Sequence, residues 1–403
     1  MNKGTWIGLI LLLGVALYLR LDYVLQADYT PLEWDQLEYT KTAIQLLEKG
    51  IYAYRDTEPN TLVTPGWPMM LAAIFSITGY EPLEPALMVV RIVNCVIALG
   101  AIVLIFLIGR RLMNAMTGVL AAAFAAIYPS YVWSASLVLT EVPFLTAFTG
   151  LIYMQVRIIQ DNKRRDHILA GILLGICVLF RPNSLPMAIV PYLILWSQAR
   201  KIQIKPALWA AASFAIVMLP WWIRNMVTFH EFIFIAKGEA GNPFLGGTDP
   251  YFRGTIDWNH IDPDKQFAAG VERIKEGLKT EPLLWLRWLT IGKLHAFYKT
   301  MWVGPYPFSI PQWYAHLLER LHDYLVHLGS LALLLFSRRD TSIRYLAVGL
   351  FVFLGIHMLF IPVDRYLYGM LPFLMLGTAY FITQTYQLVR LAIISALLQR
   401  KGI

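Results

Sequence analysis

A carboxylate and a phenol near the start of the chain have a spacing that could support chemistry. Asp35 and Tyr39 belong to the polar, acidic segment 27–68, which reads ADYTPLEWDQLEYTKTAIQLLEKGIYAYRDTEPNTLVTPGWP. Because a helix turns by about 100° per residue, these two side chains and Thr42 share one helical face. A carboxylate in such a position can take a proton from a hydroxyl group, as a general base does. The alternative interpretation of Asp35 is an aspartate that simply faces solvent.

A helix that begins at Pro31 and stops before Gly50 is predicted to carry these side chains. Thr30 and Glu33 have the spacing of a capping box, and proline suits the first turn of a helix. The apolar residues of this helix share a different face, and they are Trp34, Leu37, Ile44 and Leu47. The helix is therefore expected to lie at a membrane surface, with Asp35 turned away from its apolar face.

The composition indicates an integral membrane protein. Of the 403 residues, 57% are hydrophobic and 15% are charged, whereas soluble domains are roughly 45–50% apolar and about 25% charged. The first apolar run has no small-residue cleavage site, so an uncleaved transmembrane helix is expected there. Cys95 and Cys177 lie in apolar runs and imply no disulfide framework. The net charge of +8 comes from basic residues dispersed between apolar runs, so nucleic acid is not a predicted partner.

Ten apolar runs are predicted to be transmembrane helices, each of which needs about 20 apolar residues. They are 5–22, 86–109, 117–133, 142–159, 167–180, 183–197, 206–223, 321–337, 343–362 and 366–389. The fifth and sixth runs, on either side of Arg181, could instead form one long helix. One helix would put the basic residues near Lys163 and Arg200 on opposite sides of the membrane. The positive-inside rule favours one side for both, so a hairpin of two short helices is predicted.

With this hairpin, all basic loops lie on one side, which the positive-inside rule makes the cytoplasm. Their basic residues are Lys3, Arg110, Arg111, Lys163, Arg164, Arg165, Arg200, Lys201, Lys205, Arg338, Arg339, Arg344, Arg390, Arg400 and Lys401. Residues 1–403 are thus predicted to form a single polytopic domain with external loops at about 23–85 and 224–320. Residues 65–79 are too short to span the membrane, and 282–302 carry basic side chains on several faces. Both are predicted to be interfacial helices, with a cavity-lining or spanning helix as the alternative for 282–302.

Four arginines at the external ends of the predicted spans need partners, because an arginine well inside a bilayer costs at least ~3 kcal/mol. They are Arg91, Arg181, Arg224 and Arg365. Snorkelling to lipid headgroups is an alternative for the first three, and a local ion pair with Asp364 is an alternative for Arg365. Glu141 begins a helix, where a carboxylate is favoured in any case. Several cations around an external carboxylate are nonetheless what a site for an anionic lipid requires.

Five segments occur in the order found in a known superfamily: WDQLEY, TPGWPMMLAAIF, LTEVPF, LPWWIRNMVTFHEF and DRYLYGMLP. Over nearly its full length, the chain resembles the GT-C superfamily of polytopic glycosyltransferases. The branch it resembles contains the aminoarabinose transferases and the protein O-mannosyltransferases (dolichyl-phosphate-mannose-protein mannosyltransferase family). In this comparison Asp35 matches the carboxylate of the first external loop, and Gln36 stands where glutamate is usual. Thr64, Pro65 and Gly66 stand where aminoarabinose transferases have a Lys-Pro-Pro segment, so a donor cation must come from elsewhere.

The resemblance implies a membrane glycosyltransferase that uses a polyprenyl-phosphate sugar as donor. It would transfer the sugar, with inversion, to a hydroxyl of a glycan, lipid or protein on the external face of a plasma membrane. The short loops favour a bacterial inner membrane.

Asp35, as general base, and Glu141 are the predicted catalytic residues. The predicted substrate-binding residues are Tyr39, Arg181, Arg224, Asn225, Arg365 and Tyr366. Arg365 is the first choice for the phosphate, since Asp364 could hold its side chain.

Neither a metal nor another cofactor is predicted. The sequence has no Walker-type loop, HExxH motif or Cys/His cluster, and the resemblance implies a branch that needs no metal. Asp262 and Asp264 come closest to an Asp-x-Asp pair. The alternative function is a transporter or flippase that moves an anionic polyprenyl lipid without chemistry. Transporters often consist of two similar halves, which the ten predicted spans do not form.

Overall fold

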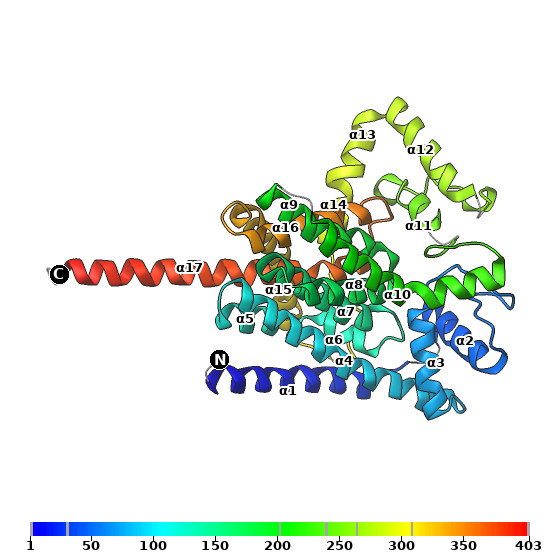
Figure 1. The fold of residues 1–403 in the computed structure, drawn as a ribbon, viewed down its shortest axis with the longest axis horizontal. Coiled ribbons are helices and arrows are strands. Elements are labelled where there is room, and N and C mark those ends of the chain that lie inside the picture. The colour runs from blue at the N-terminus through cyan, green and yellow to red at the C-terminus, as the bar shows by residue number, and fades with distance from the viewer. Residues whose placement is uncertain are drawn as a thin grey trace.

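The computed structural model describes residues 3–29, 32–200, 203–237, 241–262, 265–307 and 309–400, with the backbone alone for 396 and 398–400. Within these ranges the regular secondary structure is helical, without a β-strand, which confirms the predicted all-α class. Most of the long helices run roughly side by side, and α17 (Leu371–Arg400) extends beyond the others (Figure 1). The predicted cap residues Thr30 and Pro31 lie outside the described residues, as do Lys201, Asp264 and Lys401.

Helices occur at every predicted apolar run. Besides α17 they are α1 (Lys3–Gln26), α4 (Leu83–Leu112), α5 (Ala115–Ile127), α6 (Pro129–Trp133), α7 (Glu141–Asp161), α8 (Arg164–Phe180), α9 (Val190–Ala199), α10 (Ile204–Phe229), α15 (Gln312–Phe336) and α16 (Thr341–His357). Among the described residues, α1, α4, α7 and α10 are long and apolar enough to cross a membrane. Ala115–Ile127 and Pro129–Ser136, bent by 63°, make a fifth if they form one span. The chain is thus a multi-pass membrane protein, and the number of ten spans stays a prediction.

The fifth and sixth apolar runs do not form one continuous helix, because the helical conformation is interrupted at Arg181, as the predicted hairpin requires. α8 ends at Phe180, and Arg181 has extended backbone with φ −147° and ψ 106°. The cause lies in Pro182, because proline disfavours the helical conformation of the preceding residue. A short 3-10 helix, η2 (Pro182–Ala188), then leads into α9. The break leaves the Arg181 side chain outside the regular turns of α8.

The predicted first external loop folds into two helices that pack together, α2 (Trp34–Lys49) and α3 (Gly66–Thr78). The predicted start of this helix at Pro31 is wrong, because Glu33 has extended backbone and α2 begins at Trp34. α2 ends at the predicted glycine, since Gly50 has φ 67° and its N–H donates to the Leu46 carbonyl oxygen at 3.0 Å. Their shared core also includes α4 and Val138; its buried members are Ala43, Trp67, Leu71, Ala72, Phe75, Ala86, Leu87, Val90 and Val138. α3 is therefore a packing support that fixes α2 against the helices behind it.

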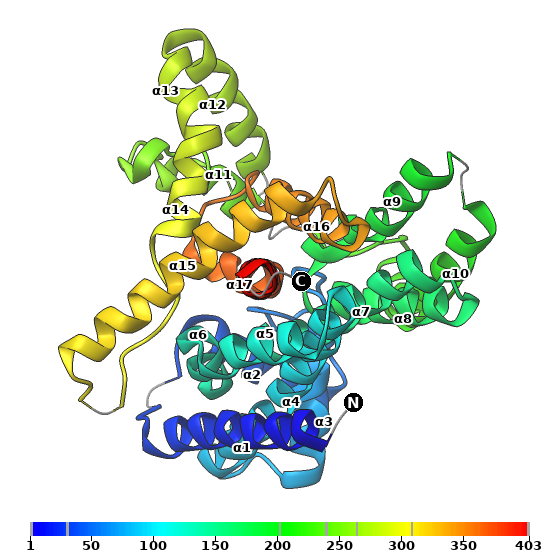
Figure 2. The ribbon, with the colours of Figure 1, turned by 90° about the vertical axis from the view of Figure 1, so that its left-hand side faces the viewer.

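Helix α17 lies near the centre of the arrangement, where Figure 2 views it end-on between α15 with α16 and α5 with α7. Its first turns are fully buried, including Leu371, Phe373 and Met375. A Cβ at Gly329 of α15 would lie 2.4 Å from the Leu374 carbonyl oxygen, so only glycine permits this close approach. The packing fixes the short 3-10 helix η7 (Asp364–Gly369), which precedes α17 and carries Arg365.

The segment predicted to form the late external loop is helical and projects from the rest of the molecule (Figure 1). It contains α11 (Gly241–Gly246), α12 (Gln266–Thr280), α13 (Pro282–Arg287), a π-helical turn (Trp288–Gly292) and α14 (Lys293–Lys299). Lys293 is buried, and its Nζ donates to the carbonyl oxygens of Met358 and Phe360 at 2.8 and 3.0 Å. This contact anchors the 282–302 segment to the end of α16. Whether the segment is interfacial stays a prediction.

Candidate functional site

Asp35, in the first turn of α2, lies among three hydrogen-bond donors. The Tyr54 hydroxyl donates to Oδ1 at 3.0 Å, and Arg55 Nη2 donates to the same oxygen at 3.2 Å. Arg365 Nη1 donates to Oδ2 at 3.2 Å. The Asp35 side chain is 32% exposed. Asp35 is therefore a partly exposed residue, and both of its oxygens have protein partners.

Glu141, the first residue of α7, is fully buried and receives two arginines. Arg181 Nη2 and Arg365 Nε both donate to its Oε1. Thr140 closes the group, since its hydroxyl accepts from Arg181 Nε at 2.9 Å and lies 3.4 Å from Glu141 Oε2. A buried carboxylate without partners would be strongly unfavourable, and two guanidinium groups together with the helix N-terminus compensate it.

These contacts unite residues that are far apart in the sequence. Asp35, Glu141, Arg181 and Arg365 come from α2, α7, the break after α8 and η7, and we call them, together with Arg55, the carboxylate–arginine cluster. Its three guanidinium groups and two carboxylates leave one unit of positive charge. Burial by itself would lower the pKa of Arg365, but the charges of Glu141 and Asp35 outweigh burial and raise it. The cluster is thus suited to a ligand that carries a single negative charge.

The contacts of Arg365 correct one expectation from the sequence. Asp364 was predicted to hold the Arg365 side chain, but its Oδ1 accepts from the backbone N–H of Arg365 at 2.9 Å. The guanidinium group instead reaches Glu141 and Asp35. The reason is geometric, because adjacent residues of a helical turn do not face each other.

Tyr39 and Tyr366 flank the cluster from two sides. The Tyr39 ring lies 5.3 Å from the Tyr54 ring, and burial together with the nearby Asp35 raises the pKa of Tyr39. Tyr39 is therefore a neutral phenol that can donate a hydrogen bond. The Tyr366 ring packs against His357 at 5.1 Å and Phe297 at 6.5 Å between centroids. The substrate-binding roles of both tyrosines stay predictions.

Arg224 and Asn225 form a separate group. Arg224 Nη1 and Nη2 donate to the carbonyl oxygens of Asn60 and Tyr52 at 3.0 and 2.8 Å, and Nη1 also donates to Asn225 Oδ1 at 3.0 Å. The structure gives neither residue a contact with the carboxylate–arginine cluster, and their roles as substrate ligands stay predictions. Arg91 is also apart from the cluster. It is buried with its guanidinium carbon 3.6 Å from the centroid of the Tyr29 ring, so it does not snorkel.

Sequence reasoning missed three residues of this region, Tyr54, Arg55 and Thr140, and it gave Gln36 no structural role. Tyr54 and Arg55 follow α2 in the segment YAYRD, whose polar aromatic composition was the one available signal. Gln36 Oε1 accepts from the Val138 backbone N–H at 2.9 Å, which ties α2 to the loop before Glu141. A glutamate here, as is usual in the superfamily that the sequence resembles, could accept the same hydrogen bond. The described residues contain no group of three His, Cys, Asp or Glu side chains that could hold a metal ion.

Comparisons with known proteins connect this geometry to a family. Residues 63–223, which include Glu141 and Arg181, match the model of the dolichyl-phosphate-mannose-protein mannosyltransferase family. No curated protein has a significant match to the sequence.

Among solved structures, the fold is similar to that of the oligosaccharyltransferase AglB from Archaeoglobus fulgidus, in complex with an inhibitory peptide and a dolichol-phosphate. The TM-score is 0.57 with 13% identity, over 98% of this chain and 52% of that chain. A complex of the same organism's enzyme with Zn and sulfate gives a TM-score of 0.58 with 13% identity, over 97% and 50%. ArnT from Cupriavidus metallidurans bound to undecaprenyl phosphate gives a TM-score of 0.47 with 14% identity, over 94% and 78%.

The chain spans about half the length of the archaeal oligosaccharyltransferase. At this identity, the likeness concerns the fold. Together with the family match, it confirms the predicted resemblance to the GT-C superfamily.

Proposed function

We propose that this chain, whose fold is that of the GT-C glycosyltransferases, transfers a sugar from a polyprenyl-monophosphate donor to a hydroxyl group of an acceptor. The match of residues 63–223 to a family named for a dolichyl-phosphate-mannose donor supports this donor class. One observation carries the proposal: Arg365 contacts Glu141 and also, at 3.2 Å, Asp35. A fixed cation beside a carboxylate is what transfer from a phosphate leaving group to a hydroxyl requires.

Arg181 and Arg365 are the proposed ligands of the donor phosphate. The described contacts of Arg365 use Nε and Nη1, and those of Arg181 use Nε and Nη2. Each guanidinium group therefore has a further nitrogen with which to bind phosphate oxygens, and this planar fork matches their geometry. The phosphate gains negative charge as its bond to the sugar breaks. Fixed arginines thus stabilise the transition state more than the bound donor.

Asp35 is the proposed general base. As the acceptor oxygen forms its bond to the anomeric carbon of the sugar, the bond from that carbon to the phosphate oxygen breaks, and the hydroxyl proton passes to Asp35. A single displacement of this kind inverts the anomeric centre. Tyr54, Arg55 and Arg365 orient the Asp35 carboxylate through the contacts described above. General-base catalysis contributes about 10²–10⁴-fold to a rate.

Glu141 is the proposed positioning residue of the site. It is fully buried and already accepts from Arg181 and Arg365, which favours a role through these arginines over proton transfer with a substrate. The sequence predicted a catalytic role for Glu141. The substitution Glu141→Gln tests both the catalytic and the positioning role. The charge of the loops supports an external site on a plasma membrane, since all predicted basic loops are on the opposite side.

The proposal is tested by incubating the purified protein, reconstituted in nanodiscs, with radiolabelled hexosyl and pentosyl polyprenyl phosphates and membrane extracts as acceptors. We expect release of the sugar from at least one donor. We expect Asp35→Asn to lower turnover by about 10²-fold or more while donor binding is kept. Asp257→Asn, at an exposed aspartate of the late external segment, is the matched control. Movement of intact lipid across the membrane without sugar release would favour the transporter instead.

A further inference from the structure

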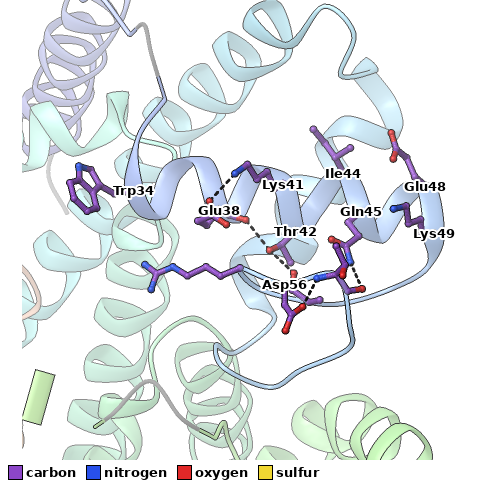
Figure 3. Close-up of a pocket in the computed structure, with 12 residues that line it drawn as sticks. Trp34, Glu38, Lys41, Thr42, Ile44, Gln45, Glu48, Lys49 and Asp56 are labelled. Atoms are coloured by element: carbon purple, nitrogen blue, oxygen red, sulfur yellow. Dashed lines mark hydrogen bonds and ion pairs between the residues drawn. The ribbon is translucent and has the colours of Figure 1, made fainter. Parts of the chain in front are cut away.

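A cavity of about 1050 Å³ lies along α2, beside the proposed base. Figure 3 shows its lining side chains, which come from α2 and from the 53–57 segment facing it. Arg55 lines the cavity and also donates to Asp35 at 3.2 Å, so its side chain contacts both the cavity and the base. The volume is at the upper end of the roughly 300–1,000 Å³ that is typical of small-molecule sites. The cavity is therefore large enough for a substrate and is one side chain away from Asp35.

The charges of the lining balance. Three carboxylates, Glu38, Glu48 and Asp56, alternate with three cations, Lys41, Lys49 and Arg55. An anionic ligand would meet the carboxylates and a cationic ligand would meet the ammonium and guanidinium groups. Hydroxyl groups both donate and accept hydrogen bonds, so they match a lining of this kind. The balance favours an uncharged ligand with many hydroxyl groups.

Each of the three lining carboxylates accepts hydrogen bonds from protein groups through one of its two oxygens. Lys41 Nζ donates to Glu38 Oε1 at 3.0 Å, and the Tyr80 hydroxyl donates to Glu48 Oε1 at 3.2 Å. Asp56 Oδ1 accepts from the backbone N–H groups of Thr57 and Glu58 at 2.7 and 3.2 Å. The described contacts leave the second oxygen of each carboxylate able to accept from a ligand hydroxyl.

Trp34, which precedes Asp35 in the sequence, adds an aromatic surface to the lining of the cavity. It is 82% exposed and has φ 51°, a left-handed conformation that bulky residues rarely adopt. Such strain persists where the surrounding structure imposes it and is frequent at ligand sites. The C–H face of a sugar ring packs favourably on the electron-rich face of an indole. An exposed tryptophan beside the base is therefore suited to a sugar ring.

We infer that this cavity binds the acceptor and that the acceptor is an uncharged carbohydrate. The inference rests on the proposed transferase function. Peptides are commonly recognised by pairing with a sheet edge or by a series of apolar pockets. The described residues contain no strand, and the cavity's apolar lining besides Trp34 is Ile44 and Ala53. Arg55, 46% exposed, moves aside when a sugar hydroxyl approaches Asp35.

Binding is tested by saturation-transfer NMR on the full chain in nanodiscs, with a panel of neutral trisaccharides, a sulfated disaccharide and a neutral Ser/Thr-containing hexapeptide. We expect signals from at least one neutral trisaccharide, weakened at least fivefold by Trp34→Ala and largely kept by Trp34→Phe. Trp313→Ala, at a tryptophan of α15 that is 69% exposed, is the matched control and should leave binding unchanged.

A second variant blocks the cavity after folding. Gln45→Cys is alkylated with a bulky maleimide, to which the buried native residues Cys95 and Cys177 should not react. Alkylation should abolish trisaccharide binding, whereas Asp35→Asn should retain it. Binding of the peptide alone, no trisaccharide binding, or binding that survives both Trp34→Ala and alkylation would overturn the inference. Sugar release from the donor without trisaccharide binding refutes this inference alone. Binding without sugar release refutes the proposed function, and the cavity is then a carbohydrate site without an acceptor role.

Discussion

Arg365 and Arg224 are both predicted at external ends of spans, yet the structure surrounds them differently. Arg365 contacts two carboxylates, those of Glu141 and Asp35. Arg224 donates to backbone carbonyl oxygens and stacks within 5.0–5.4 Å of three aromatic ring centroids, those of Tyr52, Trp221 and Phe229. Arg365 thus lies in a group of charges that includes the proposed base. The hydrogen bonds of Arg224 instead hold the predicted first external loop against α10.

The difference shows that depth and residue type are insufficient to assign an arginine to a phosphate site. Arg365 and Arg224 differ in the groups that their guanidinium groups contact. Arg365 contacts carboxylates, which can accept a proton, whereas Arg224 contacts backbone carbonyl oxygens, which take no part in proton transfer. Substitutions at four positions, Arg365, Glu141, Arg224 and Gln36, test this comparison.

The largest effect is expected at Arg365. Arg365→Ala should lower kcat by about 10²–10³-fold, as the loss of a fixed transition-state donor does in other enzymes. Arg365→Lys keeps the charge but lacks the planar fork, so it should lower kcat about tenfold with little change in donor affinity. Turnover and donor binding are measured for both, with Arg287→Lys at an exposed arginine of α13 as control. Wild-type behaviour of Arg365→Lys, and of Arg181→Lys, would contradict a phosphate site at these arginines.

Glu141→Gln should have the next largest effect. It removes the charge that Arg181 and Arg365 share, so kcat should fall by about 10–10²-fold. Breaking a buried pair by removing one partner costs about 3–5 kcal/mol, and the free energy of unfolding should fall by a similar amount. Donor turnover across a range of pH and denaturant unfolding are the measurements. If Glu141→Gln is inactive while Asp35→Asn is nearly normal, the base has been assigned to the wrong loop.

Arg224→Ala should change stability rather than chemistry. Two hydrogen bonds from its guanidinium group to Asn60 and Tyr52 are lost, so the free energy of unfolding should fall by about 2 kcal/mol. Hydrogen exchange in residues 50–65 should increase, while kcat changes less than about threefold. If Arg224→Lys lowers kcat without lowering stability, Arg224 takes part in the reaction as Arg365 does. The proposed difference between the two arginines would then be wrong.

Gln36→Glu should have the smallest effect. Glutamate can still accept from the Val138 N–H, so turnover should stay within about twofold of wild type. Gln36→Leu removes the hydrogen bond, worth about 1 kcal/mol, and serves as the contrast. An increase in kcat of tenfold or more in Gln36→Glu would show that the usual glutamate has a chemical role that this chain lacks.

The sequence was sufficient where a local signal decides the structure. The glycine at position 50 predicted where α2 ends, the distribution of basic residues predicted the break at Arg181, and apolar runs predicted where helices occur. The periodicity around Asp35 predicted which side chains share its face, but Thr42 of that face is buried, whereas Trp34 and Leu47 of the predicted apolar face are exposed. These features depend on a few neighbouring residues and on hydropathy.

The partners of the charges could not be predicted in the same way. Glu141 and Arg365 are 224 residues apart, and their contact follows from how α7 and α17 pack. The nearest charge in sequence, Asp364, was the wrong partner for the Arg365 side chain. Tyr54 and Arg55 reach Asp35 because the chain turns back after Gly50, which periodicity does not encode.

One oxygen atom of Glu141 accepts from both Arg181 and Arg365. The spacing between the two guanidinium groups is therefore set by the protein, before any ligand arrives. A pair of groups held at a fixed spacing loses little conformational entropy when it binds, so more of the contact energy appears as affinity. The same rigidity makes the site sensitive to size, because an anion that is larger or smaller than this spacing can contact one arginine well only by losing the other.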